Sequence, residues 1–324
     1  MRVLVTGAGG FIGSHVCEAV AAAGHQVRAL LRYTSHAGLG NLRFVPADVR
    51  AALELKYGDV RDPYLTRELV AGCDAVLHLA ALIAIPYSYV APQSFVDTNV
   101  NGTMTLLEAA RAAGVRRFVQ TSTSEVYGTA QRVPIDEHHP LHPQSPYAAS
   151  KVASDQMALA YHRTWGLPVV VLRPFNTYGP RQSERAVLPT ILTQATGLGH
   201  VTLGSLTPRR DWTYVTDTAD GFVRALETEG IEGDVIQLGT GSDVSVGDAA
   251  KLAFEIVQKP ADIRFDAERV RPENSEVMRL LADPARAGER LGWRARVSFE
   301  EGLRRTADWV KSHLEGMSAG RYVL

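Results

Sequence analysis

The stretch that decides the fold lies at the start of the chain and reads RVLVTGAGGFIG, residues 2–13. Its first five residues form an apolar run suited to a buried strand, and Phe11–Ala23 has helical spacing. Glycines at positions 7, 10 and 13 permit a tight turn between the two, let the backbone approach a pyrophosphate and let the helix pack closely on the strand. The helix N-terminus offers a partial positive charge to phosphates. The stretch therefore predicts a dinucleotide-binding α/β domain.

The alternation of strand and helix continues through the first half of the chain. Further strands are predicted at Gln26–Leu31, Glu54–Tyr57, Ala75–Leu79, Arg117–Ser122 and Val169–Arg173, and further helices at Pro63–Ala71, Pro92–Ala113 and Pro146–Thr164. The continuous apolar character of the strands suits a sheet that is covered on both faces. We therefore expect a Rossmann-type, doubly wound parallel sheet. The irregular, glycine-bearing segment Tyr33–Arg50 is predicted to be a surface insertion.

Beyond Gly179 the pattern changes to shorter elements. Strands are predicted at Val201–Leu203, Asp234–Leu238 and Asp262–Phe265, and helices at Val187–Thr196, Val215–Glu227, Val246–Val257 and Phe299–Leu314. We expect residues 1–179 to form the dinucleotide-binding domain, including the catalytic helix, and residues 180–324 to form mainly a smaller α/β substrate lobe. The alternative is that a late strand or helix returns to the first domain.

Composition narrows the class of protein. The 324 residues carry a net charge of −1, which provides no basic field for nucleic acid. No apolar run approaches the roughly 18–20 residues that span a bilayer, and the first residues lack the features of a signal peptide. We expect a cytoplasmic protein with buried free thiols at Cys17 and Cys73. His138, His139 and His142 are irregularly spaced among prolines and predict a loop, so we expect no metal site.

The residues after the second predicted strand bear on the choice of dinucleotide. In NAD-binding domains an acidic residue at this place binds the adenosine ribose. Here residues 30–33 read LLRY, without a carboxylate. Arg32 is suited to a 2′-phosphate, so the sequence favours NADP; NAD binding, with Arg32 as a plain surface residue, is the alternative. Asp59 lies where a loop can contact the adenine.

Two groups of polar residues point to acid–base chemistry. Tyr147 and Lys151 are four residues apart in a predicted helix, so their side chains are neighbours. An ammonium beside a phenol favours the phenolate, which predicts a lowered pKa for Tyr147 and a role in taking a proton from an alcohol during hydride transfer. Thr123, Ser124 and Glu125 follow the fifth predicted strand and add a second acid/base that simple alcohol oxidation does not need. The alternative for Glu125 is a loop cap or a solvent-facing side chain.

Six stretches spread over nearly the whole chain resemble the extended short-chain dehydrogenase/reductases, in particular the NAD(P)-dependent nucleotide-sugar epimerase/dehydratase family. They are Thr6–Gly13, His78–Ala81, Asn99–Thr103, Tyr147–Lys151, Arg173–Pro180 and Arg210–Asp217. The resemblance implies a tightly bound cofactor that is recycled in each turnover and a nucleotide-diphosphate sugar as substrate. It also implies a homodimer formed through the helices predicted at residues 92–113 and 146–164.

The resemblance also implies which residues bind. For the cofactor they are Gly7, Gly10, Phe11, Ile12, Gly13, Arg32, Asp59, Val60, Leu79, Ala80, Ala81, Asn99, Tyr147 and Lys151. For the substrate they are Tyr87, Asn176, Arg210 and Arg271. The guanidinium of an arginine matches phosphate oxygens with a bidentate fork, which suits a diphosphate. A structural ion pair is the alternative for each arginine, and these residues do not distinguish uracil from guanine.

Within the family, residues 123–125 discriminate between reactions. The 4-epimerases typically carry small residues before Val-Tyr-Gly, whereas the 4,6-dehydratases carry Asp-Glu or Ser-Glu. The stretch TSEVYG, residues 123–128, is similar to GDP-mannose 4,6-dehydratases. The stretch HLAALIAIPYSY, residues 78–89, is similar to nucleotide-N-acetylglucosamine 4,6-dehydratases of legionaminic-type sugar pathways. We therefore predict a 4,6-dehydratase acting on UDP-N-acetylglucosamine or a GDP-hexose.

The chemistry of that reaction explains the extra carboxylate. Oxidation of C4 to a ketone acidifies the C5 proton, which Glu125 is predicted to remove, while Thr123 hydrogen-bonds O4. Ser124 or Glu125 itself would assist the leaving C6 hydroxyl, and hydride return to C6 gives a 4-keto-6-deoxy sugar. Three alternatives remain: a 4-epimerase, an NAD(P)-binding sensor without catalysis, and a UDP-glucuronate decarboxylase, whose substrate carboxylate would need a cation from Arg181, Arg185 or Arg209.

Overall fold

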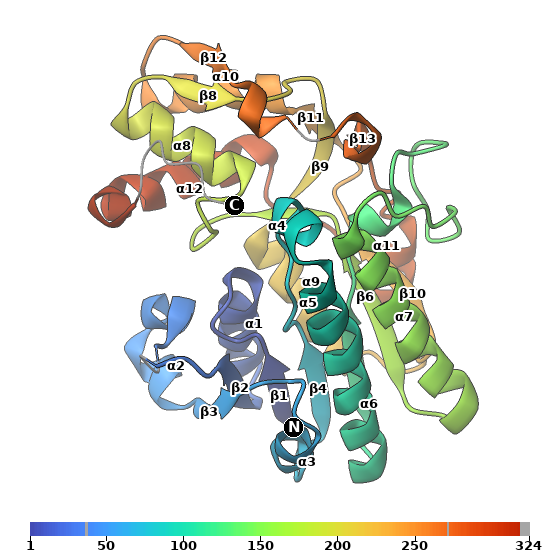
Figure 1. Ribbon diagram of the computed structural model, residues 1–324. Helices are drawn as coiled ribbons and strands as arrows, with labels where there is room; N and C mark the ends of the chain where they lie inside the picture. The colour runs from blue at the N-terminus through green and yellow to red at the C-terminus, as the bar shows by residue number, and fades with distance from the viewer. Residues whose placement is uncertain (36–37, 271, 318–324) are drawn as a thin grey trace.

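A computed structural model describes residues 1–35, 38–270 and 272–317 of the chain. A parallel sheet with helices on both faces forms the larger part, and a smaller lobe lies at one end of it (Figure 1). No helix in these residues has the length and apolar character needed to cross a membrane. Cys17 and Cys73 are buried and free.

The large sheet contains seven strands, all parallel, in the order β10-β6-β5-β4-β1-β2-β3. The fold class predicted from the sequence is thereby confirmed. The strands are β1 (Arg2–Thr6), β2 (Gln26–Arg32), β3 (Glu54–Gly58), β4 (Ala75–His78), β5 (Arg117–Thr121), β6 (Val169–Pro174) and β10 (Val235–Leu238).

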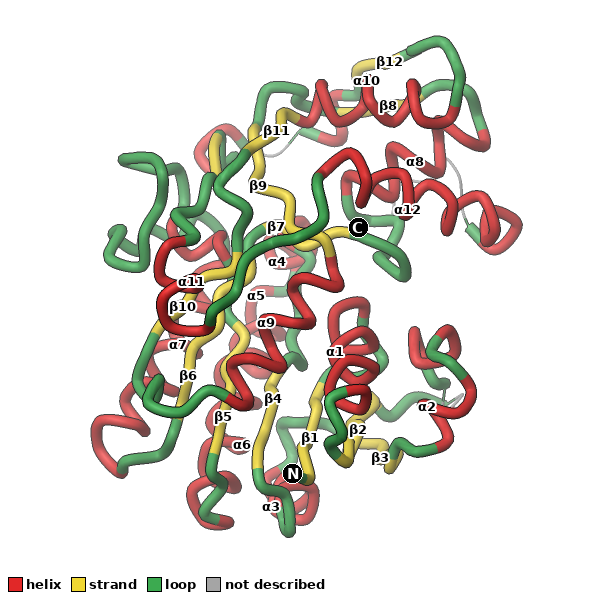
Figure 2. The backbone as a smooth tube through the Cα atoms, turned by 180° about the vertical axis from the view of Figure 1, so that it is seen from behind, coloured by secondary structure: helices red, strands yellow, loops and turns green. Residues whose placement is uncertain are grey.

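Alternate residues of each strand feed two separate cores, which explains the continuous apolar runs. On β1, Val3 and Val5 join one core and Leu4 joins the other. The first core is closed by α1 (Phe11–Ala22), α9 (Val215–Glu227) and α11 (Ala285–Leu291), and the second by α3 (Pro63–Val70), α6 (Gly102–Ala113) and α7 (Pro146–Trp165). Figure 1 shows α6 and α7 on the near face, and Figure 2 shows α1 and α9 on the opposite one.

Three sequence-based expectations change in detail. The strand predicted at residues 234–238 is β10, which lies at the edge of the large sheet, and α9 packs on the same sheet, although both elements follow residue 179 in the chain. Residues 33–50 are not only surface, because Leu42 and Val45 are buried in the first core. They include a 3₁₀ turn at Gly40–Phe44 and the start of α2 (Ala47–Ala51).

The helix predicted at residues 92–113 is interrupted by a π-helical segment. It consists of α5 (Pro92–Phe95), the π-helix η2 (Val96–Asn101) and α6. A π-turn widens the helix by one residue, and such turns are frequent at functional sites. Asn99 lies in this turn and is 1% exposed.

The smaller lobe surrounds a short mixed sheet. Its central strand β9 (Arg209–Tyr214) pairs with β7 (Asn176–Tyr178), β11 (Asp243–Ser245) and β13 (Arg279–Leu280), while β8 (Val201–Leu203) pairs with β12 (Ile263–Phe265). The helices α8 (Val187–Gly197), α10 (Val246–Val257) and α12 (Phe299–His313) enclose its core. The remaining helix, α4 (Ile85–Val90), follows β4.

The strand order reverses direction at β1, which lies between β2 and β4. Ligands of open parallel sheets bind at such a switch point, outside the carboxyl ends of the strands. In the register of β1 and β4, Thr6 lies beside His78, and the glycine loop follows at once. The fold therefore places the site where β1, β4 and β5 end.

Candidate active site

The glycine loop is shaped by two close backbone approaches. Gly7 has φ +69°, and a Cβ on it would lie 2.8 Å from the backbone nitrogen of Ala80. A Cβ on Gly13 would lie 2.1 Å from the carbonyl oxygen of Gly7. Gly10 precedes α1 and donates its N–H to the same carbonyl at 2.9 Å. Only glycine fits at positions 7 and 13. The loop leaves a cradle in front of Phe11 and Ile12, the first residues of α1, and their N–H groups suit a pyrophosphate.

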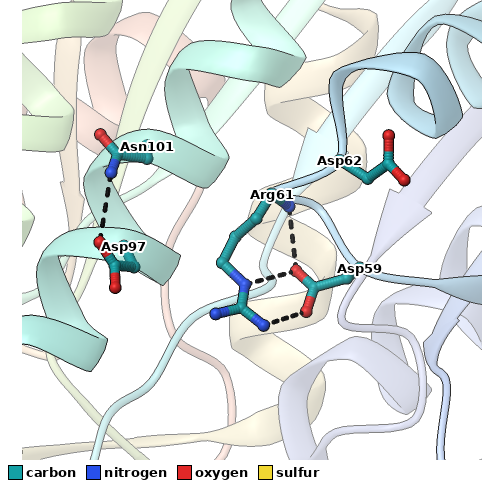
Figure 3. Close-up of a pocket in the computed structure, with 5 residues that line it drawn as sticks. All are labelled: Asp59, Arg61, Asp62, Asp97 and Asn101. Atoms are coloured by element: carbon teal, nitrogen blue, oxygen red, sulfur yellow. Dashed lines mark hydrogen bonds and ion pairs between the residues drawn. The ribbon is translucent and has the colours of Figure 1, made fainter.

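A second part of the predicted cofactor site lies beyond β3. A pocket of about 530 Å³ is lined by Asp59, Arg61, Asp62, Asp97 and Asn101 (Figure 3). Arg61 turns back onto Asp59 and donates two hydrogen bonds, of 2.9 Å from Nε and 2.6 Å from Nη2, which lower the pKa of that carboxyl. The sequence analysis singled out Asp59 but missed Arg61, although the two residues are separated by one position.

Arg32 and Val60 have different surroundings. Arg32 ends β2 with an exposed side chain, and its charge makes a smaller contribution to the lowered pKa of Asp59. Val60 is 5% exposed and packs in the second core, where a Cβ on Gly102 would come within 2.8 Å of it. The side chain of Val60 therefore contributes to the core, whereas its backbone follows Asp59, which lines the pocket.

The residues that follow β4 are held by hydrogen bonds to neighbouring elements. The backbone N–H groups of Leu79 and Ala80 both donate to the Thr6 hydroxyl at 3.1 Å. Ala81 is partly exposed beside them. The side-chain amide of Asn99, on the π-turn, makes two hydrogen bonds to the backbone of Leu82. It accepts the Leu82 N–H at 2.8 Å and donates to the Leu82 carbonyl at 2.9 Å. These bonds fix the chain that faces the glycine loop.

Tyr147 and Lys151 both lie on the buried face of α7, and they are 8% and 5% exposed. Ser145 caps the helix by accepting the Ala148 N–H at 3.1 Å. Burial lowers the pKa of Lys151 to about 8, against a smaller opposing effect of Asp155. Burial also raises the pKa of Tyr147, which the hydrogen bond from Thr123 opposes. The expectation of a lowered Tyr147 pKa is therefore wrong for the cofactor-free protein, because desolvation outweighs the Thr123 hydrogen bond and the charges of Glu125 and Asp155 raise the pKa further.

Thr123, Ser124 and Glu125 reach the same place from the end of β5. Ser124 and Glu125 begin the 3₁₀ turn η3 (Ser124–Tyr127), in which the Thr123 hydroxyl accepts the Glu125 N–H at 3.3 Å. Ser124 is 2% exposed and Glu125 is 9% exposed, and Glu125 is close enough to act on Tyr147 electrostatically. Among the described residues no cation forms an ion pair with Glu125. Because Glu125 is buried, it is not a solvent-facing side chain.

A buried ionic network beneath the site was missed by the sequence analysis. Asp155 is fully buried, pairs with Arg173 at 2.9 Å and accepts a short hydrogen bond from Ser122. Arg173 also donates to the Tyr127 hydroxyl at 2.7 Å, and that hydroxyl donates to Gln237 at 3.0 Å. Asp155 lies four residues after Lys151, so the spacing of Tyr147, Lys151 and Asp155 along one helix face was the available signal.

The predicted substrate residues lie on both sides of the site. Tyr87, on α4, is 38% exposed with its ring 6.1 Å from that of Phe95. Asn176 begins β7, and its buried Oδ1 has no hydrogen-bond partner in the described part of the chain. Arg210, on β9, is 6% exposed and pairs with Glu276 at 3.3 Å. Arg271 lies outside the described residues.

Two of the three cations considered for a decarboxylase are already paired. Arg181 binds Glu18 at 2.9 Å, and Arg209 binds Asp243 at 2.9 Å. Arg185 is exposed between β7 and α8. His139 is buried in the loop before α7, where it accepts the Gln131 N–H at 3.0 Å.

Comparisons with known proteins agree with this geometry. A sequence model of the GDP-mannose 4,6-dehydratase family matches residues 4–306. A dTDP-glucose 4,6-dehydratase of Streptomyces antibioticus is 39% identical over 321 residues, which cover 97% of this chain and 93% of the relative.

Solved structures of two relatives superpose closely. The dTDP-glucose 4,6-dehydratase DesIV of Streptomyces venezuelae, with NAD bound, has a TM-score of 0.88 and 34% identity, covering 98% of this chain and 99% of its own. A UDP-glucuronic acid 4-epimerase of Bacillus cereus, in complex with UDP-glucuronic acid and NAD, has a TM-score of 0.87 and 31% identity, covering 96% and 99%. The glycine cradle described above fits the cofactor that both relatives bind.

The buried ammonium of Lys151 leads to a prediction about stability. Because the pKa falls from 10.5 to about 8 on folding, the charged side chain costs up to about 3 kcal/mol below pH 8. That cost disappears as the pH rises from 8 to 10.5, where the unfolded chain binds the extra proton. We expect Lys151→Met to raise the free energy of unfolding at pH 7, and we expect its advantage over the wild type to shrink by pH 10.

Urea unfolding of the cofactor-free proteins at pH 7 and pH 10 measures this difference. The exposed Lys251, on α10, provides the control, since Lys251→Met is expected to change stability by no more than about 0.5 kcal/mol. The lowered pKa of Lys151 would be contradicted if Lys151→Met were less stable than the wild type at pH 7. It would also be contradicted if the difference in the free energy of unfolding between the two proteins were the same at pH 7 and pH 10.

Proposed function

The chain belongs to the GDP-mannose 4,6-dehydratase family, and from this premise we propose the roles of its residues and the class of its substrate. It is an NAD(P)-dependent nucleotide-sugar 4,6-dehydratase. One observation carries the proposed roles: Thr123 hydrogen-bonds Tyr147, Glu125 acts on Tyr147 electrostatically, and Lys151 lies one turn further along the same helix face. Glu125, Tyr147 and Lys151 are nearly inaccessible to solvent. This is more acid–base capacity than alcohol oxidation requires.

In the first step Tyr147 takes the proton of the C4 hydroxyl. Thr123 hydrogen-bonds the phenol and orients it. The glycine loop and the N–H groups of Phe11 and Ile12 would hold NAD(P), which would supply a hydride acceptor for C4 and a hydride donor for C6. Since burial raises the pKa of Tyr147, the phenolate requires nearby positive charge, and the Lys151 ammonium on the same helix face supplies part of it.

In the second step Glu125 removes the C5 proton, which the new C4 ketone has acidified. A leaving C6 hydroxyl also needs a proton. Ser124 is a poor donor because a general acid works best with a pKa near the operating pH, and an aliphatic hydroxyl lies far above it. We therefore assign both tasks to Glu125: it takes the proton from C5 and delivers it to O6, and water leaves with formation of a C5–C6 double bond. The returning hydride adds to C6 and a proton from solvent adds to C5, while Tyr147 releases to solvent the proton that it took from O4.

The substrate is a nucleotide-diphosphate sugar bound between the two parts of the molecule. We assign Asn176 and Arg210 to the diphosphate and Tyr87 to the sugar, and we assign Arg271 to the diphosphate by family resemblance alone. The unpartnered Oδ1 of Asn176 supports a polar ligand at this position. UDP-N-acetylglucosamine and a GDP-hexose remain our candidates, and the names of the relatives add dTDP-glucose.

We propose that the protein is a homodimer formed through η2, α6 and α7. The family resemblance suggests these helices, and their surfaces carry exposed apolar side chains. Val96 is 43% exposed, Met104 is 40% exposed and Trp165 is 53% exposed. Burial of such side chains against a second copy is favourable.

A substrate panel tests the proposed reaction. The purified protein is incubated with UDP-N-acetylglucosamine, GDP-mannose, dTDP-glucose and UDP-glucuronate, and the products are analysed by mass spectrometry. We expect the loss of one water from one of the first three. Loss of carbon dioxide from UDP-glucuronate would identify a decarboxylase, and an isomer of unchanged mass an epimerase. Absence of turnover together with absence of NAD(P) binding would contradict all three of these reactions.

Replacement of Glu125 separates the two steps. We expect Glu125→Gln to lower the rate of water loss by about 10²–10⁴-fold, the usual contribution of a positioned general base. Oxidation at C4 should continue slowly, so reduced cofactor should accumulate and absorb near 340 nm. Tyr147→Phe provides the comparison, because it should abolish both water loss and the reduced cofactor. Full dehydratase activity of Glu125→Gln would refute its role.

Arg32 tests the proposed preference for NADP over NAD. Its position at the end of β2, the absence of an acidic residue there and the engagement of Asp59 by Arg61 support a 2′-phosphate contact. We expect Arg32→Ala to weaken NADP binding roughly tenfold, since hydrogen bonds to charged groups contribute about 1.5–3 kcal/mol, and to leave NAD binding nearly unchanged. Calorimetry with both cofactors measures this. Arg67→Ala, an exposed charge change on α3, is the control, and equal effects of Arg32→Ala on both cofactors would refute the preference.

A further inference from the structure

We infer that His78 is a positioning residue for the reaction, held as the neutral Nε2–H tautomer in a hydrogen-bond chain that joins the strand before the glycine loop to the catalytic helix. His78 ends β4 and is 2% exposed. Its effect on catalysis rests on the proposed function, whereas its tautomer does not.

The bonds of Thr6 determine what His78 does at Nδ1. The Thr6 hydroxyl accepts the N–H groups of Leu79 and Ala80, which occupies both of its lone pairs. Its single proton is therefore directed to Nδ1 of His78, 2.8 Å away. Nδ1 accepts this bond and so carries no proton.

The bonds of Thr103 lead independently to the same tautomer. The Thr103 hydroxyl donates its proton to the carbonyl oxygen of Asn99 at 2.6 Å. Nε2 of His78 lies 3.1 Å from that hydroxyl and must therefore be the donor between them. A ring with an acceptor at Nδ1 and a donor at Nε2 is a neutral imidazole in one fixed tautomer.

The chain continues from the π-turn to Tyr147. The Asn99 carbonyl, which accepts from Thr103, also accepts from Ser154 on α7 at 2.7 Å. The Asn99 side chain donates to the Ser150 hydroxyl at 2.9 Å, and Ser150 donates to the carbonyl of Tyr147 at 2.7 Å. Every link is buried, and the Ser154 hydroxyl also lies 2.7 Å from the Ser150 carbonyl, a second acceptor for its proton. The end of β1 is thus connected to the first turn of α7.

A protonated His78 would break this order. Its Nδ1–H would face the Thr6 hydroxyl, whose lone pairs are already filled, so one proton would lose its acceptor. The surroundings of the ring also favour the neutral form: the charge of Lys151, from α7, lies within electrostatic range, and the uncharged Phe118 ring from β5 lies 6.2 Å away. Burial together with the Lys151 charge lowers the pKa of His78 to about 3. His78 therefore stays neutral throughout the range in which the enzyme works.

This arrangement affects catalysis through geometry. The chain fixes the π-turn and the start of α7 relative to the glycine loop, and hence Tyr147 relative to the cofactor cradle. A displacement of about 1 Å in a reacting group costs up to roughly 100-fold in rate. Loss of a link should therefore lower kcat more than it changes KM.

The tautomer is tested directly on the wild-type protein. Nitrogen-15 NMR of histidine-labelled enzyme should show His78 protonated at Nε2 and not at Nδ1, without titration between pH 5 and 8; the resonance is assigned by its absence in His78→Gln. A resonance of the Nδ1–H tautomer, or titration in this range, would overturn the inference. The measurement needs no substrate, so it stands even if the proposed reaction fails.

The effect on catalysis is tested at Thr103, which is neither a cofactor nor a substrate contact. Thr103→Val keeps the shape and removes the hydroxyl; we expect the rate of cofactor reduction in a single turnover to fall about 10-fold to 100-fold, with KM changed less than about threefold. Thr103→Ser restores the hydroxyl and should recover most of the rate. Thr6→Val and Thr6→Ser repeat the comparison at the other end of the ring, should one pair fold poorly. Equal rates for the valine and serine variants would overturn the positioning role.

Discussion

The close approach of Gly7 to Ala80 is the constraint on which the rest of the site depends. A Cβ on Gly7 would lie 2.8 Å from the Ala80 nitrogen, which is too close. Because glycine has no Cβ, β1 and β4 can end side by side with their loops in contact. The same contact brings the Thr6 hydroxyl to two backbone N–H groups and to His78. The cofactor cradle, the buried hydrogen-bond chain and the position of α7 all follow from it.

Burial is the second theme of the site, and it acts differently on each group. It lowers the pKa values of Lys151 and His78 and raises that of Tyr147. His78 avoids the cost by remaining neutral between two hydroxyl groups, whereas the role that we propose for Lys151 requires its charge. Asp155, on the same helix and paired with Arg173, lessens the cost to Lys151. A functional site that strains local stability in this way is expected of an enzyme.

Local patterns predicted the first six strands of the large sheet, the glycine loop and the Tyr147–Lys151 pair, because each depends on residues close in sequence. They did not predict the π-turn that turns Asn99 inward, since helical periodicity hides a single inserted residue. They also gave the wrong direction for the Tyr147 pKa, because spacing shows the neighbouring ammonium and not the desolvation of the phenol. Arg61 and Asp155 were missed although Asp59 and Lys151 lie close to them in sequence, whereas the pairing of Asp155 with Arg173 is visible only in the folded chain.

The sequence by itself determined the class of fold, the dinucleotide cradle and the surplus carboxylate at Glu125, because alternation, glycine spacing and motif order are properties of short segments. Only the tertiary structure decided that β10 joins the large sheet and that α9 covers it. It also decided that two of the arginines considered for a substrate carboxylate are already paired, and that His78 has a fixed tautomer. The physical reason is common to all three. Each depends on hydrogen bonds, ion pairs or packing between residues tens to hundreds of positions apart, and these exist only once the chain has folded.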